Sequence, residues 1–394
     1  MRTSSMSLLL CSALLIVACA GSPAPPPTST TTPVTTTGTG GSGGGGTGSS
    51  VKGPFSSTGG LNTARAVHTA TLLPNGKVLV AGGEGNFSQP LASAELYDPS
   101  TGMFTSTGSM ITARSSHAAT LLGNGKVLIV GGFDDIQDED PPLASAELYD
   151  PSTGMFTATG SMITTQSVVS ATLLQDGRVF VAGVIDAEIY DPVSGIFAPT
   201  SAYVDSYPMA WDTVNLLADG RVLLTGCTEF CNAGATELFD PKSGTFSKAG
   251  PMSGWGDANT ATRLTDGRIL IVGSDENDGM PADAELYDPA AGTFTSIVKA
   301  LASHEFSTSV RLTDGTVLIV GGQLAGGNGS TASELYLPAT STFASVGGMT
   351  TGRHSHTATL MPDGTVLIIG GFSVWPTPTA SAEIYDPSCA GCWD

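Results

Sequence analysis

Seven Asn-Gly or Asp-Gly pairs recur along the chain, and this repeat restricts the possible folds more than any other feature. They lie 43 to 52 residues apart, each between two apolar runs. Such a pair is the strongest local signal for a β-hairpin, because a two-residue type I′ turn needs positive φ at both positions. The pairs are Asn75-Gly76, Asn124-Gly125, Asp176-Gly177, Asp219-Gly220, Asp266-Gly267, Asp314-Gly315 and Asp363-Gly364.

The sequence predicts a strand on each side of every pair. In the second repeat these strands are His117–Leu122 and Lys126–Val130. The second of them is apolar at successive positions, so we expect it to be covered on both faces, as in a sheet stacked between two others.

A further motif, Glu-Leu/Ile-Tyr/Phe-Asp-Pro, also occurs once in each repeat, although the sixth copy has Leu337 in place of Asp. An Asp-Pro pair with a Gly three residues after the Pro is typical of a turn. A short segment with a Phe follows it. Each repeat therefore predicts four antiparallel strands, a to d from the inside outward. The motif starts at Glu95, Glu147, Glu188, Glu237, Glu285, Glu334 and Glu383.

Units of about 50 residues that each form one four-stranded sheet are typical of a kelch-type β-propeller. The chain resembles bacterial kelch-repeat proteins, and the propeller of galactose oxidase in particular, over roughly residues 53–388. The resemblance is carried by the Arg-x-x-His strand start, the Asn/Asp-Gly-x-Val-Leu turn, the Gly-Gly pairs and the Glu-Leu-Tyr-Asp-Pro motif. It implies an all-β, seven-bladed propeller that occupies residues 53–394.

The last repeat lacks its own strand d, because only seven residues follow Pro387. Residues 53–59 copy the d strand of residues Met103–Gly108. We therefore predict that the N-terminal segment pairs with the last sheet, which joins the two ends of the domain and removes an exposed edge.

Residues 1–18 have the pattern of a secretory signal, with Arg2, the apolar run Leu8–Val17 and small residues before Cys19. Ile16-Val17-Ala18-Cys19 resembles the bacterial lipobox, which implies cleavage before Cys19 and its lipidation. Ordinary cleavage with an unmodified Cys is the alternative. The resemblance implies a protein anchored by lipid in the bacterial cell envelope, at the outer membrane, on its periplasmic or outer surface.

Residues 19–52 are Pro, Thr, Ser and Gly with almost no apolar side chains. They cannot bury a core, so we predict a disordered tether with a reach on the order of 30 Å. The chain has 15 Lys and Arg against 35 Asp and Glu, a net charge of −20. That charge argues against nucleic acid as a partner and against electrostatic docking on anionic lipid.

The cysteines of the domain form two close pairs, Cys227 with Cys231 and Cys389 with Cys392. In an oxidising compartment these predict local disulfides. Free thiols, or a redox-active pair at Cys389 and Cys392, are the alternatives.

The repeats also separate scaffold from site. A residue present in every repeat serves the fold, so the strand-c Glu residues are predicted to be buried partners of backbone or neighbouring side chains. The a–b and c–d turns are short and uniform and should lie on one face. The b–c and d–a connections vary and should lie on the other, here called the variable face, where function is expected.

The first, second and seventh repeats start strand a with Arg and His three residues apart, and the sixth has His304 in the place of the Arg. Side chains of Arg65, Arg114 and Arg353 are predicted to form a cationic arc for a carboxylate or phosphate, with His304 beside it. Across the tunnel lie Tyr207, Trp211, Trp255 and Asp257, which would suit sugar rings or apolar groups. The alternative is structural. The strand-a Arg and His residues then only pack against the neighbouring blade, and Trp211 and Trp255 belong to the core. These residues are Arg65, Arg114, Arg353, His68, His117 and His356.

Two acidic loops, Asp134–Asp140 and Asp275–Gly279, have oxygen ligands at close spacing but match no complete calcium motif. They are cation sites or solvated loops, and we predict no metal site and no cofactor.

Two functions compete. The first is a binding module for protein or glycan ligands. The second is a carbohydrate-active enzyme of the sialic-acid mutarotase type, with His304 and Glu305 as acid and base beside an Arg clamp. Copper chemistry like that of galactose oxidase needs a Tyr–Cys crosslink, and the domain's only cysteines are the two local pairs, so we predict no such activity.

Overall fold

The computed structural model describes residues 54–135, 141–166, 168–204, 210–227, 234–252, 260–273, 283–324 and 326–389. The chain divides into two compact units, Met1–Lys52 and Gly53–Asp394. All described residues belong to the second unit, so the predicted signal, Cys19 and the tether lie outside them. In the described part, one 3-10 helix, η1 (Asn86–Ser88), accompanies the strands.

The described residues form seven separate antiparallel sheets, six of four strands and one of seven. We number them by their order along the chain and list their strands from the inside outward. The first three are sheet 1 with β2 (Thr69–Leu72), β3 (Val78–Ala81), β4 (Ala94–Asp98) and β5 (Met103–Ser106), sheet 2 with β6 (Ala118–Leu121), β7 (Val127–Val130), β8 (Ala146–Asp150) and β9 (Met155–Ala158), and sheet 3 with β10 (Val168–Leu173), β11 (Val179–Gly183), β12 (Ala187–Asp191) and β13 (Ile196–Pro199).

The next regular sheets keep the same order, and the last one takes its outermost strand from the start of the domain. They are sheet 4 with β14 (Ala210–Leu216), β15 (Val222–Cys227), β16 (Gly234–Asp240) and β17 (Thr245–Lys248), sheet 5 with β18 (Thr260–Arg263), β19 (Ile269–Val272), β20 (Ala284–Asp288) and β21 (Thr293–Ser296), and sheet 7 with β27 (Thr357–Leu360), β28 (Val366–Ile369), β31 (Ala382–Tyr385) and β1 (Phe55–Ser57).

Sheet 6 is larger because its connections also form strands. Its regular part is β22 (Thr308–Arg311), β23 (Val317–Val320), β25 (Asn328–Leu337) and β26 (Thr342–Arg353), and its additional strands are β24 (Gln323–Leu324), β29 (Phe372–Val374) and β30 (Thr377–Pro378). β29 and β30 follow β28 of sheet 7 in the chain, yet they join the enlarged sheet through the pairing of Val374 with Asn328.

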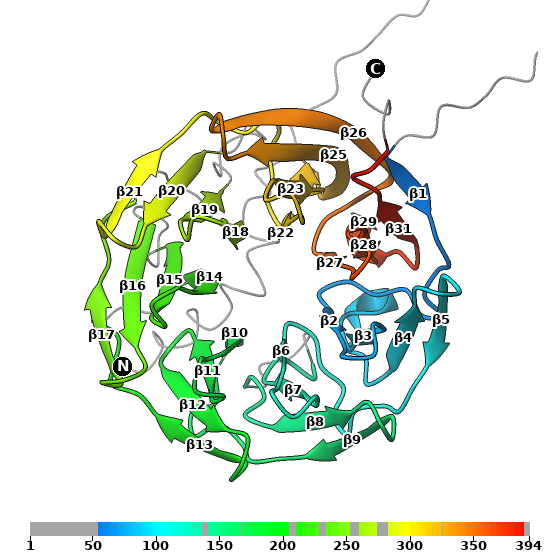
Figure 1. The fold of residues 1–394 in the computed structure, drawn as a ribbon. Helices are drawn as coiled ribbons and strands as arrows, with labels where there is room; N and C mark the ends of the chain where they lie inside the picture. Colours follow the sequence, from blue (N-terminus) through cyan, green and yellow to red (C-terminus); the bar gives the residue numbers. More distant parts are fainter. Residues whose placement is uncertain are drawn as a thin grey trace, which may run out of the picture. The chain divides into compact units, whose positions relative to one another are not determined.

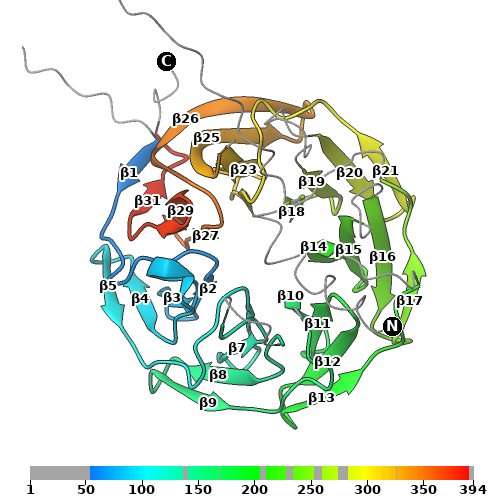
Figure 2. The ribbon, with the colours of Figure 1, turned by 180° about the vertical axis from the view of Figure 1, so that it is seen from behind.

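The sheets stand around a common centre, as Figures 1 and 2 show from the two faces. Each innermost strand contacts the innermost strand of the next sheet, and β27 contacts β2, which closes the ring. The predicted all-β propeller architecture is therefore confirmed, with six regular four-stranded blades and the enlarged sheet 6 between two of them.

One apolar cluster fills each space between neighbouring sheets. Between sheets 1 and 2, for example, Leu79 and Ala81 pack with Val127, Ile129 and Tyr149. All four residues of β7 are fully buried, as predicted for a strand covered on both faces. The hydrophobic core of the domain is therefore divided among the spaces between the sheets, which explains how a chain of this length folds without one very large core.

The N-terminal strand closes the last sheet as predicted. β1 pairs antiparallel with β31, and Phe55 lies opposite Tyr385 with ring centroids 5.1 Å apart. The same register joins Tyr97 to Phe104 in sheet 1, where the centroids are 4.9 Å apart. Phe55 therefore takes the position that a strand-d Phe holds in the other sheets.

The prediction of type I′ turns at the Asn-Gly and Asp-Gly pairs is wrong. In all seven turns the Gly has positive φ, whereas the Asn or Asp before it does not. Gly76 N donates to Leu73 O (2.9 Å), and Leu73 N donates to Lys77 O (2.8 Å). This is the three-residue loop in which a type I turn precedes a left-handed Gly, so one residue more than expected belongs to each turn.

Candidate functional site

The three Arg residues predicted to bind ligand are buried in ion pairs. Arg65, Arg114 and Arg353 have no exposed surface. Each donates to the Glu of strand c in its own sheet: Arg65 to Glu95 (2.9 Å), Arg114 to Glu147 (2.9 Å) and Arg353 to Glu383 (2.7 Å).

The Nη1 group of each Arg donates to backbone carbonyls. Arg114 Nη1 donates to the carbonyls of Gly131 (2.8 Å) and Ser145 (3.1 Å). Glu147 in turn accepts from the backbone N–H groups of Ile111 (2.8 Å) and Thr112 (3.1 Å), so one ion pair ties the d–a connection to strands b and c. The cationic arc is therefore not an accessible surface, which corrects that prediction. The predicted burial of the strand-c Glu residues is confirmed.

His304 replaces the Arg in sheet 6 and has the same structural role. It is fully buried, with Nδ1 3.1 Å from Gly321 O and Nε2 3.1 Å from Glu334 Oε1. In sheet 3 the position holds Gln166, which donates to Asp186. His304 is thus not available to a ligand, another correction. The enzyme interpretation loses the Arg clamp and the acid that it required, and we do not propose it.

The predicted alternative role of the strand-a His residues, packing against the neighbouring blade, is the one observed. His117 Nε2 of sheet 2 lies 2.9 Å from Thr69 Oγ1 of sheet 1, and His68 Nε2 of sheet 1 lies 2.9 Å from Thr357 Oγ1 of sheet 7. Burial lowers the pKa of His117 to about 3, with a further contribution from the charge of Arg114. Burial likewise holds the pKa of His68 and His356 well below the ordinary value.

These histidines predict acid-sensitive folding. A His whose pKa is lowered in the folded state keeps its stabilising effect above about pH 6.5, and stability falls as the unfolded state takes up protons below that pH. Both proteins should lose unfolding free energy when the pH is lowered from 7 to 5. The loss in His117→Gln should be about 2 kcal/mol smaller than the loss in the wild type. Urea unfolding at both pH values measures this. An equal loss in the two proteins would show that His117 is protonated in the folded state.

The inner rim of the variable face is held by backbone contacts between sheets. Val67 N donates to Ser355 O (3.0 Å), Ser116 N to Val67 O (3.3 Å), and Ser355 N to Phe306 O (3.0 Å). All four residues have left-handed φ of 51° to 52°, which is uncommon for residues other than Gly. Because they occupy equivalent positions in sheets 6, 7, 1 and 2, the conformation belongs to the repeat.

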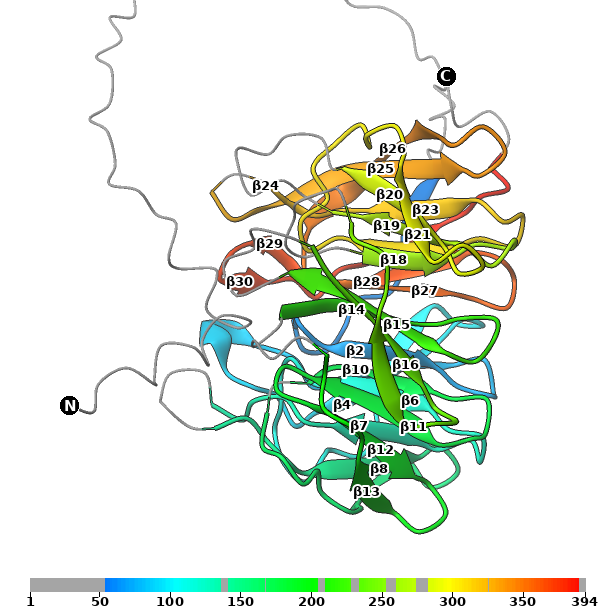
Figure 3. The ribbon, with the colours of Figure 1, turned by 90° about the vertical axis from the view of Figure 1, so that its left-hand side faces the viewer.

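The b–c connections of sheets 6, 7 and 1 build a projection on the variable face. β24 and β25 form a hairpin, Asn328 pairs with Val374 of β29, and Trp375 N donates to Gly327 O (3.0 Å). β30 also contacts η1 of sheet 1. In Figure 3, β24, β29 and β30 extend beyond the sheets on one side.

This projection exposes apolar side chains that the sequence analysis did not select. Phe87 in η1 is 85 % exposed, and Trp375 is 38 % exposed. Leu324 and Val374 are exposed beside them on the adjoining strands. No sequence pattern marks them, because they come from three separate connections, each unique among the repeats. We call Phe87, Leu324, Val374 and Trp375 the loop cluster.

Inside the projection, His354 lies between two aromatic rings. Its ring centroid is 6.3 Å from that of Phe306 and 5.4 Å from that of Phe372. Burial lowers its pKa to about 4, although the nearby carbonyl of Gly327 acts in the opposite direction. His354 is therefore neutral near pH 7 and serves as part of the packing.

The variable face also carries a carboxyl group without a partner among the described residues. Glu84 follows the Gly-Gly pair after β3, and its side chain is partly buried. Burial raises the pKa of this carboxyl to about 7. Such a group was not selected from the sequence, since the only signal is that Glu84 stands where sheets 2 and 7 have Phe133 and Phe372.

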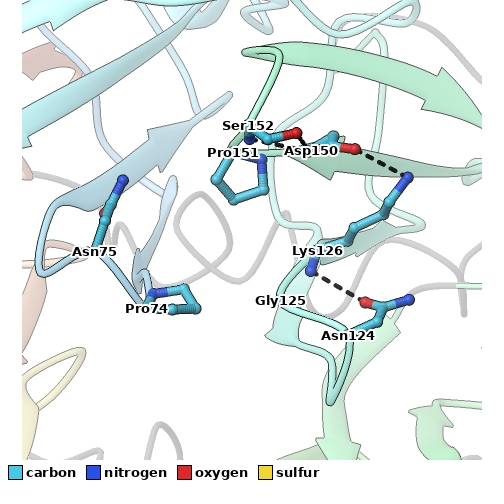
Figure 4. A pocket seen from close by; sticks show the side chains of 8 residues that line it. All are labelled: Pro74, Asn75, Asn124, Gly125, Lys126, Asp150, Pro151 and Ser152. Atoms are coloured by element: carbon cyan, nitrogen blue, oxygen red, sulfur yellow. Dashed lines mark hydrogen bonds and ion pairs between the residues drawn. The ribbon is translucent and has the colours of Figure 1, made fainter.

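A pocket of about 390 Å³ lies on the opposite face, between the a–b turns of sheets 1 and 2 (Figure 4). Its polar groups already bind one another: Lys126 Nζ is 3.1 Å from Asp150 Oδ2, and Lys126 N donates to Asn124 Oδ1 (3.1 Å). It is lined by Pro74, Asn75, Asn124, Gly125, Lys126, Asp150, Pro151 and Ser152. The pocket thus belongs to the turns of the scaffold.

Other predicted site residues lie outside what the structure describes. These are Tyr207, Trp255, Asp257, Cys231, Cys392, Cys19 and the tether. For Trp211 in β14 and Cys227 in β15 the backbone alone is described. Cys389 is disulfide-bonded. Of the acidic loops, Asp134 and Asp135 are described and residues 136–140 and 275–279 are not.

The described residues contain no group of three or more His, Cys, Asp or Glu side chains that could hold a metal ion. Nor does this part of the chain include a helix with the length and apolar character of a membrane span.

Comparison with known proteins agrees with the fold. The kelch motif matches residues 65–111 and 114–162. A solved structure described as a novel fungal alcohol oxidase with catalytic diversity among the AA5 family, in complex with copper, aligns with a TM-score of 0.64 over 85 % of this chain and 76 % of that one. At 19 % identity it shows the fold alone. No curated protein sequence matches.

The two matched motifs begin at Arg65 and Arg114, the arginines of the first two buried ion pairs. The closed ring of antiparallel sheets makes the domain a β-propeller, and the two matches place kelch motifs in its first two repeats.

Proposed function

We propose that the protein is a binding module that contacts protein or glycan ligands through the loop cluster on its variable face. The observation that carries the proposal is the exposure of Phe87, Leu324, Val374 and Trp375. Two of their three connections are joined by backbone pairing, and the third, with η1, contacts β30. Exposed apolar groups on an ordered projection favour a contact surface, because binding there buries apolar area at little cost in loop ordering.

The repeat supports this placement by contrast. Exposed apolar residues elsewhere, such as Met103 and Met155 on the d strands, recur at equivalent positions and so follow the repeat. The residues of the loop cluster have no such equivalents. A Trp with a polar edge and an apolar face suits both sugar rings and protein side chains.

We further infer a seven-bladed propeller, with sheet 6 counted as a blade in spite of its additional strands. What supports this count is the order a to d kept by β22, β23, β25 and β26 within the larger sheet. Lipid attachment at Cys19 and display at the bacterial cell envelope, by the tether of residues 19–52, complete the proposal. Its support is the lipobox pattern in the sequence.

A binding screen with matched variants tests the contact surface. The mature protein is applied to a glycan array. In a second assay, it is cross-linked to the proteins that it contacts on the surface of the producing cells. Trp375→Ala is expected to weaken any binding found by about tenfold or more, since aromatic residues dominate such interfaces. Val193→Ser is the control, because Val193 is 97 % exposed in a c–d turn on the other face. Equal binding by the two variants and the wild type would place the ligand elsewhere.

A further inference from the structure

Sheets 5 and 6 each carry an exposed Arg where strand a meets the a–b turn, on the face opposite the variable face. Arg263 is the last residue of β18, and Arg311 is the last residue of β22. These innermost strands of neighbouring sheets contact each other near the centre of the ring (Figure 1). Arg311 Nη1 donates to the backbone carbonyl of Arg263 (3.0 Å), so its guanidinium lies directly beside residue 263. We call Arg263 and Arg311 the arginine pair.

The repeat shows that the fold does not require an Arg at these positions. The other five repeats have a Leu there, at the same distance from the Asn/Asp-Gly turn, and each Leu packs against an apolar cluster between two sheets. They are Leu72, Leu121, Leu173, Leu216 and Leu360. The sequence Arg-Leu-Thr-Asp-Gly occurs in repeats 5 and 6 and in no other repeat. The exposed Arg therefore replaces a side chain that contributes to the core elsewhere.

The arginine pair also differs from the other arginines in its charge partners. The described residues include eight arginines, and six of them form an ion pair with a carboxylate. Arg263 and Arg311 are the two without a carboxylate partner in this part of the chain, and they are neighbours. Two adjacent like charges repel each other, so a bound anion would lower the free energy of this arrangement.

The carboxylates of the two a–b turns are bound within their own turns. Asp266 pairs with Arg268 (2.7 Å). Asp314 accepts from the backbone N–H of Thr316 (2.9 Å) and from its hydroxyl (2.7 Å). The two turns together with the arginine pair thus keep a net positive charge in a protein with a net charge of −20. Local contacts favour an anion here, and repulsion by the rest of the protein restricts it to a small ligand.

We propose that the arginine pair binds the phosphate monoester group of a small ligand. Guanidinium groups donate paired hydrogen bonds to phosphate oxygens, and a phosphate monoester carries close to two negative charges near pH 7, which two cations match. The one hydrogen bond that the Arg311 side chain makes within the described residues uses Nη1, which leaves Nε and Nη2 for the ligand. This site goes beyond the proposed function, because it lies on the face opposite the loop cluster and does not depend on it.

The test uses the mature protein and two probes of similar shape, the dianion phenyl phosphate and the monoanion phenyl sulfate, titrated by calorimetry at pH 7.5 and low salt. Phenyl phosphate is expected to bind about five- to tenfold more tightly than phenyl sulfate. Arg263→Leu and Arg311→Leu should each weaken phenyl phosphate binding about tenfold or more. Arg178→Gln is the control, since it removes the same charge from the a–b turn of sheet 3, where Arg178 pairs with Asp176 (2.7 Å). Its effect should be about twofold at most.

Thermal unfolding separates a ligand site from a structural role. Because Leu is the residue of the other repeats, Arg263→Leu and Arg311→Leu should unfold at the temperature of the wild type or above it. Retained stability together with lost phenyl phosphate binding supports the site. The proposal is overturned if the wild type binds neither probe or both equally, if either Leu variant binds phenyl phosphate as the wild type does, or if Arg178→Gln weakens binding as much as they do. A Leu variant that unfolds at a lower temperature would assign its Arg to the scaffold, which also overturns the proposal.

Discussion

Replacing Arg114 with Ala is expected to destabilise the domain by about 3 to 5 kcal/mol, the range for a buried ion pair that loses one partner. Arg114 and Glu147 are both buried. Arg114 also donates to the carbonyls of Gly131 and Ser145, and Glu147 accepts from the backbone N–H groups of Ile111 and Thr112. The substitution leaves the Glu147 charge without its cation in a site closed to water. Urea unfolding at pH 7 measures the loss.

The same sheet offers a control for this prediction. Lys126 and Asp150 form an ion pair at 3.1 Å in which both side chains are partly exposed. Lys126→Ala removes the same charge and should cost less than about 1 kcal/mol, because water screens exposed pairs. If Arg114→Ala costs no more than Lys126→Ala, the Arg is not the structural element described above, and its use as a ligand-binding group must be considered again.

Loss of β1, the strand that closes the ring, should also lower the stability of the domain strongly. Phe55 is buried against Leu312, Val346 and Tyr385. Phe55→Ala should lower stability by about 3 kcal/mol or more, as for other large-to-small core changes. Deletion of residues 54–58 should cost more than this, since it also leaves the β31 edge unpaired and available to another chain.

Phe104→Ala in sheet 1 separates burial from closure. Phe104 has the same register with Tyr97 that Phe55 has with Tyr385, but its strand follows directly in the chain. Thermal unfolding should show about the same loss of stability for Phe55→Ala and Phe104→Ala. The deletion alone should associate in size-exclusion chromatography with light scattering. A deletion variant that stays monomeric and as stable as Phe104→Ala would mean that β1 does not close the ring.

The sequence predicted most of the fold because each repeat has the same local pattern of apolar and turn residues. The apolar run of strand b, the Asn/Asp-Gly turn, the Tyr or Phe of strand c and the Phe of strand d recur in the same order, so the copies support one another where a single copy is ambiguous. The turn type was mistaken, since Asn-Gly fits both a two-residue and a three-residue loop and the backbone hydrogen bonds decide between them.

The candidate site was predicted poorly for a physical reason. Arg65, Arg114 and Arg353 have the residue type of an anion site, but whether a guanidinium faces solvent or a buried Glu about 30 residues away depends on how strand c lies beside strand b. Composition and spacing along the chain carry no such information.

What the amino-acid sequence alone determined is the repeating unit: the strands, their apolar faces, the place of the corners and the N-terminal strand that completes the last sheet. These follow from interactions between residues that are near in the chain or repeated along it. Only the tertiary structure decided which polar groups are paired inside the protein and which side chains are exposed to a ligand, because burial and pairing depend on contacts between strands and sheets. By that criterion Arg65, Arg114 and Arg353 belong to the scaffold, and the loop cluster and the arginine pair are the candidate sites.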